Sequence, residues 1–149
     1  MKIKKIMPPI WLIIAISAMI LLHFLVPGGW VVPKIWNLSG LVFIIAGVMM
    51  NLVADNAFHR VKTTVKPFEE STMLVTKGVF QLSRNPMYLG FTLILVGVAV
   101  FLRTLSPYIV ILAFVILIDT TYIRVEEQML AEKFGASWET YKSRARRWL

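Results

Sequence analysis

Apolar and polar positions alternate in long blocks along this chain, and the apolar blocks have the length of membrane-spanning helices. The apolar blocks are residues 10–26, 35–54, 86–102 and 105–123. A helix needs roughly 17–20 mostly apolar residues to cross the hydrocarbon core of a bilayer, and each block meets that length. The pattern therefore predicts an all-α integral membrane protein with four transmembrane helices, organised as one membrane-embedded domain over residues 1–149.

The polar blocks predict a surface loop and a helical tail. Residues 55–85 form a basic segment that is too short for a separate domain. Residues 124–149 predict a helix, a break at Gly135 and a second, amphipathic helix that contains Lys, Arg, Trp and Tyr. A basic amphipathic helix with aromatic residues is typical of a segment that lies on lipid headgroups.

The distribution of basic residues predicts how the chain is oriented in the membrane. The chain has 16 Lys and Arg residues and a net charge of +8. Three of the 16 precede the first apolar block, five lie in the 55–85 loop and six in the tail, which leaves Lys34 and Arg103 on the other side. Basic residues collect on the cytoplasmic side of membrane proteins. We therefore expect a multi-pass protein of the prokaryotic inner membrane, with both termini, the loop and the tail in the cytoplasm.

Several kinds of chemistry are disfavoured by what the sequence lacks. There is no cysteine, which excludes disulfides, thiolate metal sites and cysteine nucleophiles, and two histidines do not predict a metal site. No Walker-type phosphate loop and no G-x-G-x-x-G after a strand occur, so neither nucleotide hydrolysis nor a Rossmann cofactor domain is predicted. Basic residues at the ends of membrane helices suit anionic lipid headgroups, and we expect no nucleic-acid partner.

The chain is organised around residues 74–90, where the basic loop gives way to the third apolar block. Their sequence is LVTKGVFQLSRNPMYLG. Asn85 is a residue type favoured at helix N-caps, and Pro86 suits the first helical position because the N–H of that position is unpaired in any case. The free N–H groups of a helix start beside Arg84 could receive an anionic group. The alternative is a well-capped helix that enters the membrane with an Arg reaching the interface.

Acidic residues near the end of the fourth apolar block predict a second part of the same site. At 3.6 residues per turn, Asp119, Tyr122 and Glu126 lie on one helix face. Carboxylates at a membrane boundary are costly and usually have a function. They could hold a cationic ligand or pair with Arg84, whereas the alternative for Glu126 and Glu127 is a solvated acidic turn.

These residues together resemble the signature of the isoprenylcysteine carboxyl methyltransferase family, a broad family with phospholipid N-methyltransferase relatives. The signature has a Leu-Val-Thr-x-Gly lead and then Arg-His/Asn-Pro-x-Tyr-x-Gly, and residues 74–90 contain both. Its later Glu-Glu, Phe-Gly and Tyr elements are matched in order by Glu126-Glu127, Phe134-Gly135 and Tyr141. The resemblance covers residues 62–145 and implies a membrane methyltransferase that uses S-adenosyl-L-methionine without a Rossmann domain.

Carried over residue by residue, the resemblance implies a cofactor site and two candidate catalytic arginines. Glu126 would bind the amino group of the cofactor, and Arg84 and Arg124 would serve catalysis. No metal is implied. The expected cofactor-binding residues are Thr72, Met73, Leu74, Val75, Gly78, Phe80, Asn85, Pro86, Met87, Tyr88 and Glu126.

Departures from the family pattern leave the methyl acceptor open. Asn85 stands where the family has His, and Phe80 stands where it has Tyr. Tyr122 stands at the spacing of a substrate-binding Arg, for which Arg124 could substitute. The implied acceptor is lipophilic or a small amphiphile: a prenyl-cysteine-like carboxylate, a lipid headgroup or a thiol.

Two functions from other classes stay open beside the methyltransferase. A non-enzymatic membrane module could bind anionic lipid or a protein partner through its basic cytoplasmic face. A channel or transporter would need a polar stripe, which four short spans lack unless they oligomerise. The expected partners are membrane lipids and a lipophilic acceptor, and the sequence is compatible with a monomer.

Overall fold

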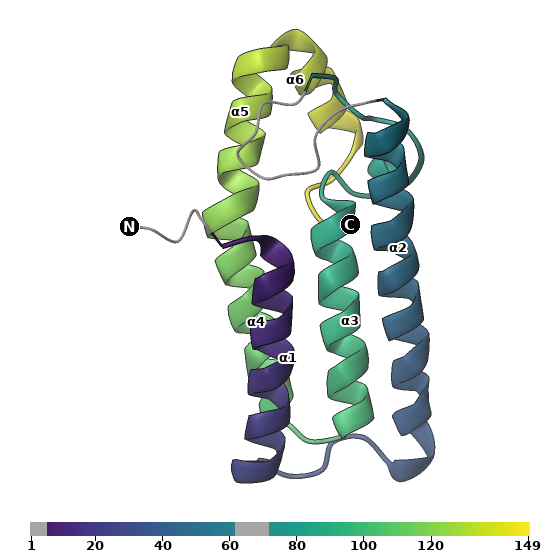
Figure 1. Ribbon diagram of the computed structural model, residues 1–149, viewed down its shortest axis with the longest axis vertical. Helices are drawn as coiled ribbons and strands as arrows, with labels where there is room; N and C mark the ends of the chain where they lie inside the picture. Colours follow the sequence, from purple (N-terminus) through teal and green to yellow (C-terminus); the bar gives the residue numbers. More distant parts are fainter. Residues whose placement is uncertain (1–5, 62–71) are drawn as a thin grey trace.

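The computed structural model describes residues 6–61 and 72–149, and every regular element within those ranges is helical (Figure 1). The all-α prediction is therefore confirmed. The part of the predicted 55–85 loop that falls on residues 62–71 lies outside the described residues. The four main helices run side by side as an elongated bundle: α1 (Pro8–Leu25), α2 (Gly40–Arg60), α3 (Pro86–Leu102) and α4 (Ser106–Ile118).

Within residues 6–61 and 72–149, three helical segments are long and apolar enough to cross a membrane. They are Pro8–Leu25, Lys34–Arg60 and Ser106–Phe134. The helix Pro86–Leu102 is apolar but shorter, with 17 residues, and it has the predicted bounds. Four transmembrane spans therefore stay a prediction, three of which meet the length criterion within the described residues.

The second helix continues further into the polar loop than predicted. The apolar pattern ends at residue 54, whereas α2 continues to Arg60 and is preceded by a 3₁₀ helix, η2 (Lys34–Ser39). The carboxylate of Asp55 lies 3.2 Å from Nε2 of His59, one turn later. Polar pairs four residues apart stabilise a helix, so α2 can continue beyond the end of the apolar block at residue 54.

The fourth apolar block is not a regular α-helix. After α4, a π-helical turn, η4 (Asp119–Ile123), leads into α5 (Arg124–Phe134), and the three elements form one continuous rod. The predicted helix after residue 124 and its end before Gly135 are confirmed, and this helix continues from the fourth apolar block without a break. A π-turn adds about one residue to a turn, which rotates everything after it by roughly 100° relative to a regular helix.

Glycines allow α2 and α3 to pack closely. A Cβ atom added at Gly40 would meet the carbonyl oxygen of Gly97, and one added at Gly47 would meet the carbonyl oxygen of Gly90. Small residues let helix backbones approach one another in membrane proteins, where dispersion contacts replace the hydrophobic effect as the driving force. The Gly47–Gly90 pair holds the start of α3, and with it residues 84–90, against α2, and the Gly40–Gly97 pair does the same nearer the other end of α3.

Two clusters of buried side chains make up the core. The first lies between α1, α3 and α4 and includes Met19, Leu95 and Ile118. The second lies where α5 leads into α6 (Ala136–Arg144) and includes Phe80 and Trp138. The chain can turn sharply between α5 and α6 because Gly135 has a φ of 48°, a conformation that side chains disfavour. As Figure 1 shows, α6 is thereby folded back across the end of the bundle.

Candidate functional site

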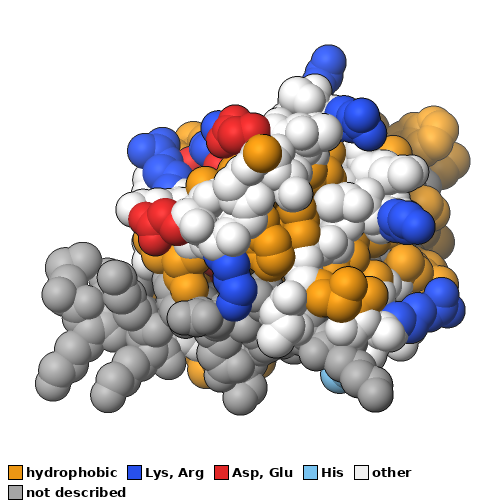
Figure 2. Space-filling model, turned by 90° about the horizontal axis from the view of Figure 1, so that it is seen from above, with side chains coloured by type: hydrophobic (Ala, Val, Ile, Leu, Met, Phe, Trp, Pro, Cys, Tyr) orange, Lys and Arg blue, Asp and Glu red, His pale blue; other side chains and the backbone are white. Residues whose placement is uncertain are grey.

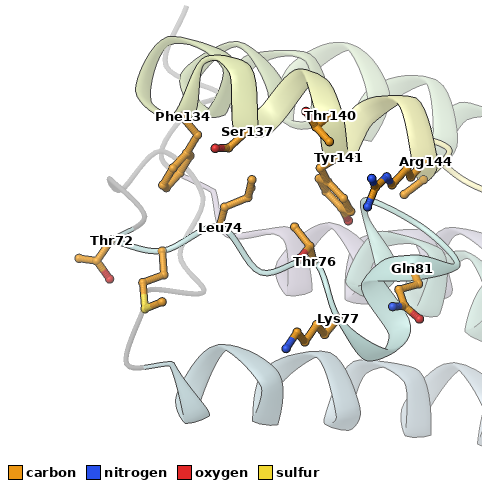
Figure 3. Close-up of a pocket in the computed structure, with 12 residues that line it drawn as sticks. Thr72, Leu74, Thr76, Lys77, Gln81, Phe134, Ser137, Thr140, Tyr141 and Arg144 are labelled. Atoms are coloured by element: carbon orange, nitrogen blue, oxygen red, sulfur yellow. The ribbon is translucent and has the colours of Figure 1, made fainter.

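A cavity of about 970 Å³ lies between α6 and the segment that leads into the 3₁₀ helix η3 (Gly78–Gln81) (Figure 3). Small-molecule sites usually have volumes of roughly 300–1,000 Å³. One wall consists of Thr72, Met73, Leu74, Thr76, Lys77 and Gln81, and the other of Phe134, Ser137, Thr140, Tyr141, Arg144 and Ala145. The two walls come from distant parts of the sequence, so folding alone brings them together.

One face of α6 forms the second wall. Ser137, Thr140, Tyr141 and Arg144 lie at i, i+3, i+4 and i+7, which is one side of a helix. Trp138, on another side, packs into the second core cluster. The short helix is therefore anchored by its aromatic side and offers its hydroxyl and basic side to the cavity.

Tyr141 connects the two walls directly. Its hydroxyl donates a hydrogen bond of 2.7 Å to the backbone carbonyl of Phe80 in η3. Burial raises the pKa of Tyr141 to about 12, so the hydroxyl keeps its proton, and its role as a donor, at neutral pH. The chain enters η3 through Gly78, whose φ of 66° suits glycine.

The described lining of the cavity is basic and aromatic. Lys77 and Arg144 contribute positive charge, and no Asp or Glu occurs among the lining residues in the described ranges. Phe134 and Tyr141 offer aromatic rings, and Figure 2 shows further Lys and Arg side chains around this end of the molecule. Such walls can receive a ligand that combines a flat ring with an anionic group.

Arg84 is part of a buried ion pair close to this cavity. Its Nη2 lies 2.9 Å from Oε1 of Glu127, and the arginine side chain is only 9% exposed. Its Nη1 donates to the carbonyls of Lys142 and Ala145, at 3.1 Å each, and its guanidinium lies 5.7 Å from the ring centroid of Trp138. Of the alternatives that the sequence left open for these carboxylates, Glu127 takes the pairing with Arg84, and its side chain, which is 12% exposed, is not part of a solvated turn.

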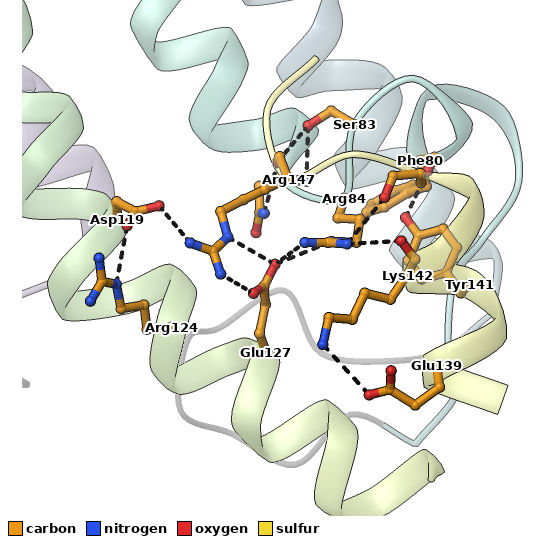
Figure 4. Close-up of polar contacts among 12 residues, drawn as sticks. Phe80, Ser83, Arg84, Asp119, Arg124, Glu127, Glu139, Tyr141, Lys142 and Arg147 are labelled. Atoms are coloured by element: carbon orange, nitrogen blue, oxygen red, sulfur yellow. Dashed lines mark hydrogen bonds and ion pairs between the residues drawn. The ribbon is translucent and has the colours of Figure 1, made fainter. Parts of the chain in front are cut away.

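A second arginine shares Glu127 and extends the network (Figure 4). Nη2 of Arg147 lies 2.6 Å from Oε2 of Glu127, and its Nη1 lies 3.4 Å from Oδ1 of Asp119. The hydrogen bond to Glu127 raises the pKa of Arg147. Nε of Arg124 lies 3.2 Å from the other carboxylate oxygen of Asp119. The network thus places three guanidinium groups around two carboxylates.

The π-turn decides which acidic residue joins this network. In a regular helix Asp119 would share a face with Glu126, but the extra residue in η4 rotates the following helix by roughly 100°. Asp119 consequently shares Arg147 with Glu127 instead. The prediction that Asp119, Tyr122 and Glu126 lie on one face is wrong for Asp119.

Glu126 and Tyr88 form a separate polar pair. The hydroxyl of Tyr88 donates a 2.6 Å hydrogen bond to Oε1 of Glu126, and the rings of Tyr88 and Tyr122 lie 6.4 Å apart. The hydroxyl of Tyr122 accepts a hydrogen bond of 2.9 Å from Nε1 of Trp11 and donates one of 2.6 Å to the carbonyl of Ile6. The α4–α5 rod is therefore hydrogen-bonded to α1 through Tyr122 and to α3 through Glu126, one helical turn later.

Asn85 stands at the start of α3 but does not cap it with its side chain. The helix begins at Pro86, as predicted, but the Asn85 side chain makes no cap hydrogen bond. Its amide instead donates 3.0 Å to the carbonyl of Arg147, and its own N–H donates 3.0 Å to Oγ of Ser83. The predicted N-cap position is therefore confirmed, but the Asn85 side chain binds the Arg147 carbonyl instead of the start of the helix.

Comparison with known proteins identifies the family of this chain. Residues 35–137 match the model of the phospholipid methyltransferase family. The chain belongs to this family. The family resemblance predicted from the signature is thus confirmed, and the matched range extends from η2 through α2, α3, α4 and α5 to the start of α6.

Two curated proteins are similar to this member of the phospholipid methyltransferase family. The protein-S-isoprenylcysteine O-methyltransferase of Saccharomyces cerevisiae is 36% identical over 115 residues, which are 74% of this chain and 47% of the yeast protein. An uncharacterized protein of Haemophilus influenzae is 35% identical over 63 residues, which are 42% of this chain and 100% of that protein. The chain spans about half the length of the yeast relative.

The structure divides the predicted cofactor-binding residues of this phospholipid methyltransferase family member among several places. Thr72, Met73 and Leu74 line the cavity. Phe80 is buried in the second core cluster, where Val75 and Met87 pack against it. The remaining predicted residues lie in η3 (Gly78), at the start of α3 (Asn85 and Pro86) and in the separate polar pair (Tyr88 and Glu126).

The two predicted catalytic arginines are not brought together. Arg84 is buried against Glu127, whereas the Arg124 side chain is 63% exposed and pairs with Asp119 at the far side of the network. The sequence reasoning also missed most of the α6 wall, including Ser137, Thr140 and Arg144. The helical spacing of these hydroxyl and basic residues is a usable signal, although the sequence predicts only that the basic residues of this helix, Arg144 among them, contact headgroups.

Proposed function

We propose that this chain is an integral membrane methyltransferase that takes a methyl group from S-adenosyl-L-methionine and transfers it to a lipophilic or small amphiphilic acceptor. The observation that carries the proposal is the match of residues 35–137 to the phospholipid methyltransferase family. The similarity to the yeast protein-S-isoprenylcysteine O-methyltransferase supports it. Three helices of membrane-spanning length support the membrane location.

The cavity residues fit parts of this cofactor. Phe134 and Tyr141 can contact the adenine ring, and the hydroxyls of Ser137 and Thr140 can bind polar groups of the ribose. Lys77 or Arg144 can bind the carboxylate of the methionine part. The lining thus suits the flat ring, the ribose hydroxyls and the carboxylate of this cofactor.

The ammonium group of the cofactor needs an acidic partner, and the family resemblance assigns that role to Glu126. This carboxylate accepts a hydrogen bond from Tyr88 and does not line the cavity. We therefore propose Glu126 for the ammonium on the resemblance and the cavity walls for the rest of the molecule. Each assignment is tested by its own variant below.

The chain's own residues have modest tasks in the proposed reaction. When bound, S-adenosyl-L-methionine supplies an electrophilic methyl group, so the protein needs no covalent nucleophile. Tyr141 and Arg84 hold the walls of the cavity together, which orients a ligand and limits the entry of water. A carboxylate or thiolate acceptor needs no general base, whereas an amine must lose a proton.

The alternative is a non-enzymatic module that binds anionic lipid through the same basic end of the molecule. The Lys and Arg side chains spread over this end in Figure 2 favour it. The two functions differ in whether the cavity binds an adenosyl ligand, because headgroup binding by surface charge does not need a cavity.

The deciding experiment is calorimetric titration of S-adenosylhomocysteine into detergent-solubilised protein. Ser137→Trp should strongly weaken binding, because a large ring on the α6 wall then projects into the space that the ligand needs. Ser143→Trp is the matched control, since Ser143 is an exposed residue of the same helix that does not line the cavity. Transfer of a labelled methyl group to lipid extracts, prenyl-cysteine analogues and thiols then identifies the acceptor. Binding to anionic vesicles without any binding of S-adenosylhomocysteine would favour the module.

A further inference from the structure

The last residues of the chain, 145–149, form what we call the C-terminal strap, which runs from the end of α6 to the start of α3. The carbonyls of three successive residues, Ala145, Arg146 and Arg147, all accept hydrogen bonds from Ser83, Arg84 and Asn85. The distances are 3.1 Å from Arg84 Nη1, 2.8 Å from the Arg84 N–H, 3.1 Å from Ser83 Oγ and 3.0 Å from the Asn85 amide. The central residues of the family signature therefore bind the strap.

The strap is also fastened through the side chain of Arg147. This side chain lies 2.6 Å from Glu127, which follows the π-turn in α5, and 3.4 Å from Asp119, the first residue of the π-turn. The next residue, Trp148, packs against the first core cluster. The side chain of Arg146, by contrast, belongs to an exposed residue, and the structure records no ion pair for it among the described residues. Two adjacent arginines of equal charge thus have different surroundings.

The strap begins at the wall of the cavity. Arg144 and Ala145 line the cavity, and the Ala145 carbonyl is the first of the three that are held. The N-terminal end of α6 is joined to α5 through the sharp turn at Gly135. Between these ends, Tyr141 connects α6 to Phe80. The strap is therefore the attachment that holds the C-terminal end of this wall.

We propose that Arg147 is a positioning residue, which fastens the C-terminal strap and so holds the α6 wall at the distance from residues 72–81 that a ligand of the cavity requires. The identity of that ligand rests on the proposed function, but the position of the wall does not. Arg147 itself does not line the cavity and acts through the strap and α6. Of its two carboxylate partners, Asp119 begins the π-turn and Glu127 follows it, so the position of Arg147 depends on the path of that turn.

The position of the wall can be measured by electron-spin distance measurements in detergent. The chain has no cysteine, so two introduced cysteines carry the only spin labels. Asn56→Cys on α2 and Ser143→Cys on α6 are at exposed residues. The parent pair should give one narrow distance distribution. The test compares this distribution after Arg147→Gln and after Arg146→Gln, which remove the same charge from adjacent residues.

We expect Arg147→Gln to broaden or shift the distribution, and Arg146→Gln to leave it unchanged. Arg147→Lys should give an intermediate result, because its ammonium keeps the charge but lacks the fork that spans two carboxylates. In the same variants without labels, the dissociation constant of S-adenosylhomocysteine should rise about tenfold for Arg147→Gln, a typical size for coupling between separate parts of a protein. It should change less than about twofold for Arg146→Gln.

Equal distance distributions for Arg147→Gln and Arg146→Gln would overturn the proposal. If the parent itself binds no S-adenosylhomocysteine, the proposed function fails, and the distance measurement still decides the role of Arg147. If Arg147→Gln cannot be purified folded, Asp119→Asn replaces it, because this variant removes one of the two anchors. A broadened distribution in Asp119→Asn then supports the proposal, and an unchanged one contradicts it.

Discussion

Tyr88 donates a 2.6 Å hydrogen bond to Glu126, which connects the first turn of α3 to α5. The two residues are 38 positions apart in the sequence and belong to the two separate parts of the family signature. The contact therefore joins the two parts of the signature across the interface of α3 and α5. It leads to one prediction about stability and one about the ligand.

Tyr88→Phe should lower the free energy of unfolding by about 1–3 kcal/mol, because it leaves a half-buried carboxylate without its donor. Unfolding in detergent micelles, followed by circular dichroism, measures the change. Tyr108→Phe is the control, since it removes a hydroxyl near the start of α4 at the other end of the bundle. Equal stability of Tyr88→Phe and the parent would mean that the hydrogen bond does not hold α3 to α5.

Glu126→Gln should weaken binding of S-adenosylhomocysteine by about ten- to a hundred-fold, because a charge-assisted contact to the ammonium is lost. The fold should persist, since an amide oxygen can still accept the hydrogen bond from Tyr88. Glu132→Gln, at an exposed residue of α5, removes the same charge and should bind like the parent. Calorimetry on both variants checks this. Normal affinity in Glu126→Gln would show that Glu126 does not bind the ligand, and the proposed site would then consist of the cavity residues alone.

Arg84→Gln should destabilise the protein by about 1.5–3 kcal/mol, because it removes hydrogen bonds to a charged group while Arg147 still neutralises Glu127. Glu127→Gln should also destabilise it, and the effects of the two single variants should not add in the double variant. The interaction energy should be about 0.5–3 kcal/mol in a double-mutant cycle of chemical unfolding. Strict additivity would show that the pair in Figure 4 does not contribute to stability.

Gly47→Ala should destabilise the bundle by about 1–3 kcal/mol, because the added methyl group meets the Gly90 carbonyl and pushes α2 from α3. Val48→Ile, at a residue that is 42% exposed on the same helix, adds a methylene outside this contact and serves as the control. Thermal unfolding in detergent compares the two. Equal thermal-unfolding midpoints for Gly47→Ala and Val48→Ile would mean that moving α2 away from α3 costs little free energy.

An alkaline phosphatase reporter, which is active only outside the cytoplasm, should be inactive when fused to Leu149. The expectation follows from the 14 of 16 basic residues on one predicted side. The fusion site is accessible, since Leu149 is 70% exposed. A fusion after Gly29, in the segment between α1 and η2, should be active. The opposite pattern would invert the topology, and activity at both sites would contradict an even number of spans.

The sequence by itself determined where the helices lie and to which family the chain belongs. The bounds of α3 and the break at Gly135 follow from local properties: the length of an apolar run, the fixed φ of Pro86 and the conformational freedom of glycine. The signature from Leu74 to Gly90 also needs no folding to be seen. Local rules failed where polar residues continued a helix, as in α2 beyond residue 54.

Only the tertiary structure decided how the polar residues are paired. A regular helix predicts Asp119 beside Glu126, whereas the π-turn places it with Glu127, because one extra residue rotates every later side chain by roughly 100°. Arg84 meets its carboxylate 43 residues away, and Arg147 meets the two carboxylates at 20 and 28 residues. No local period encodes contacts of this range, since they depend on how α3, the α4–α5 rod and the C-terminal strap pack together.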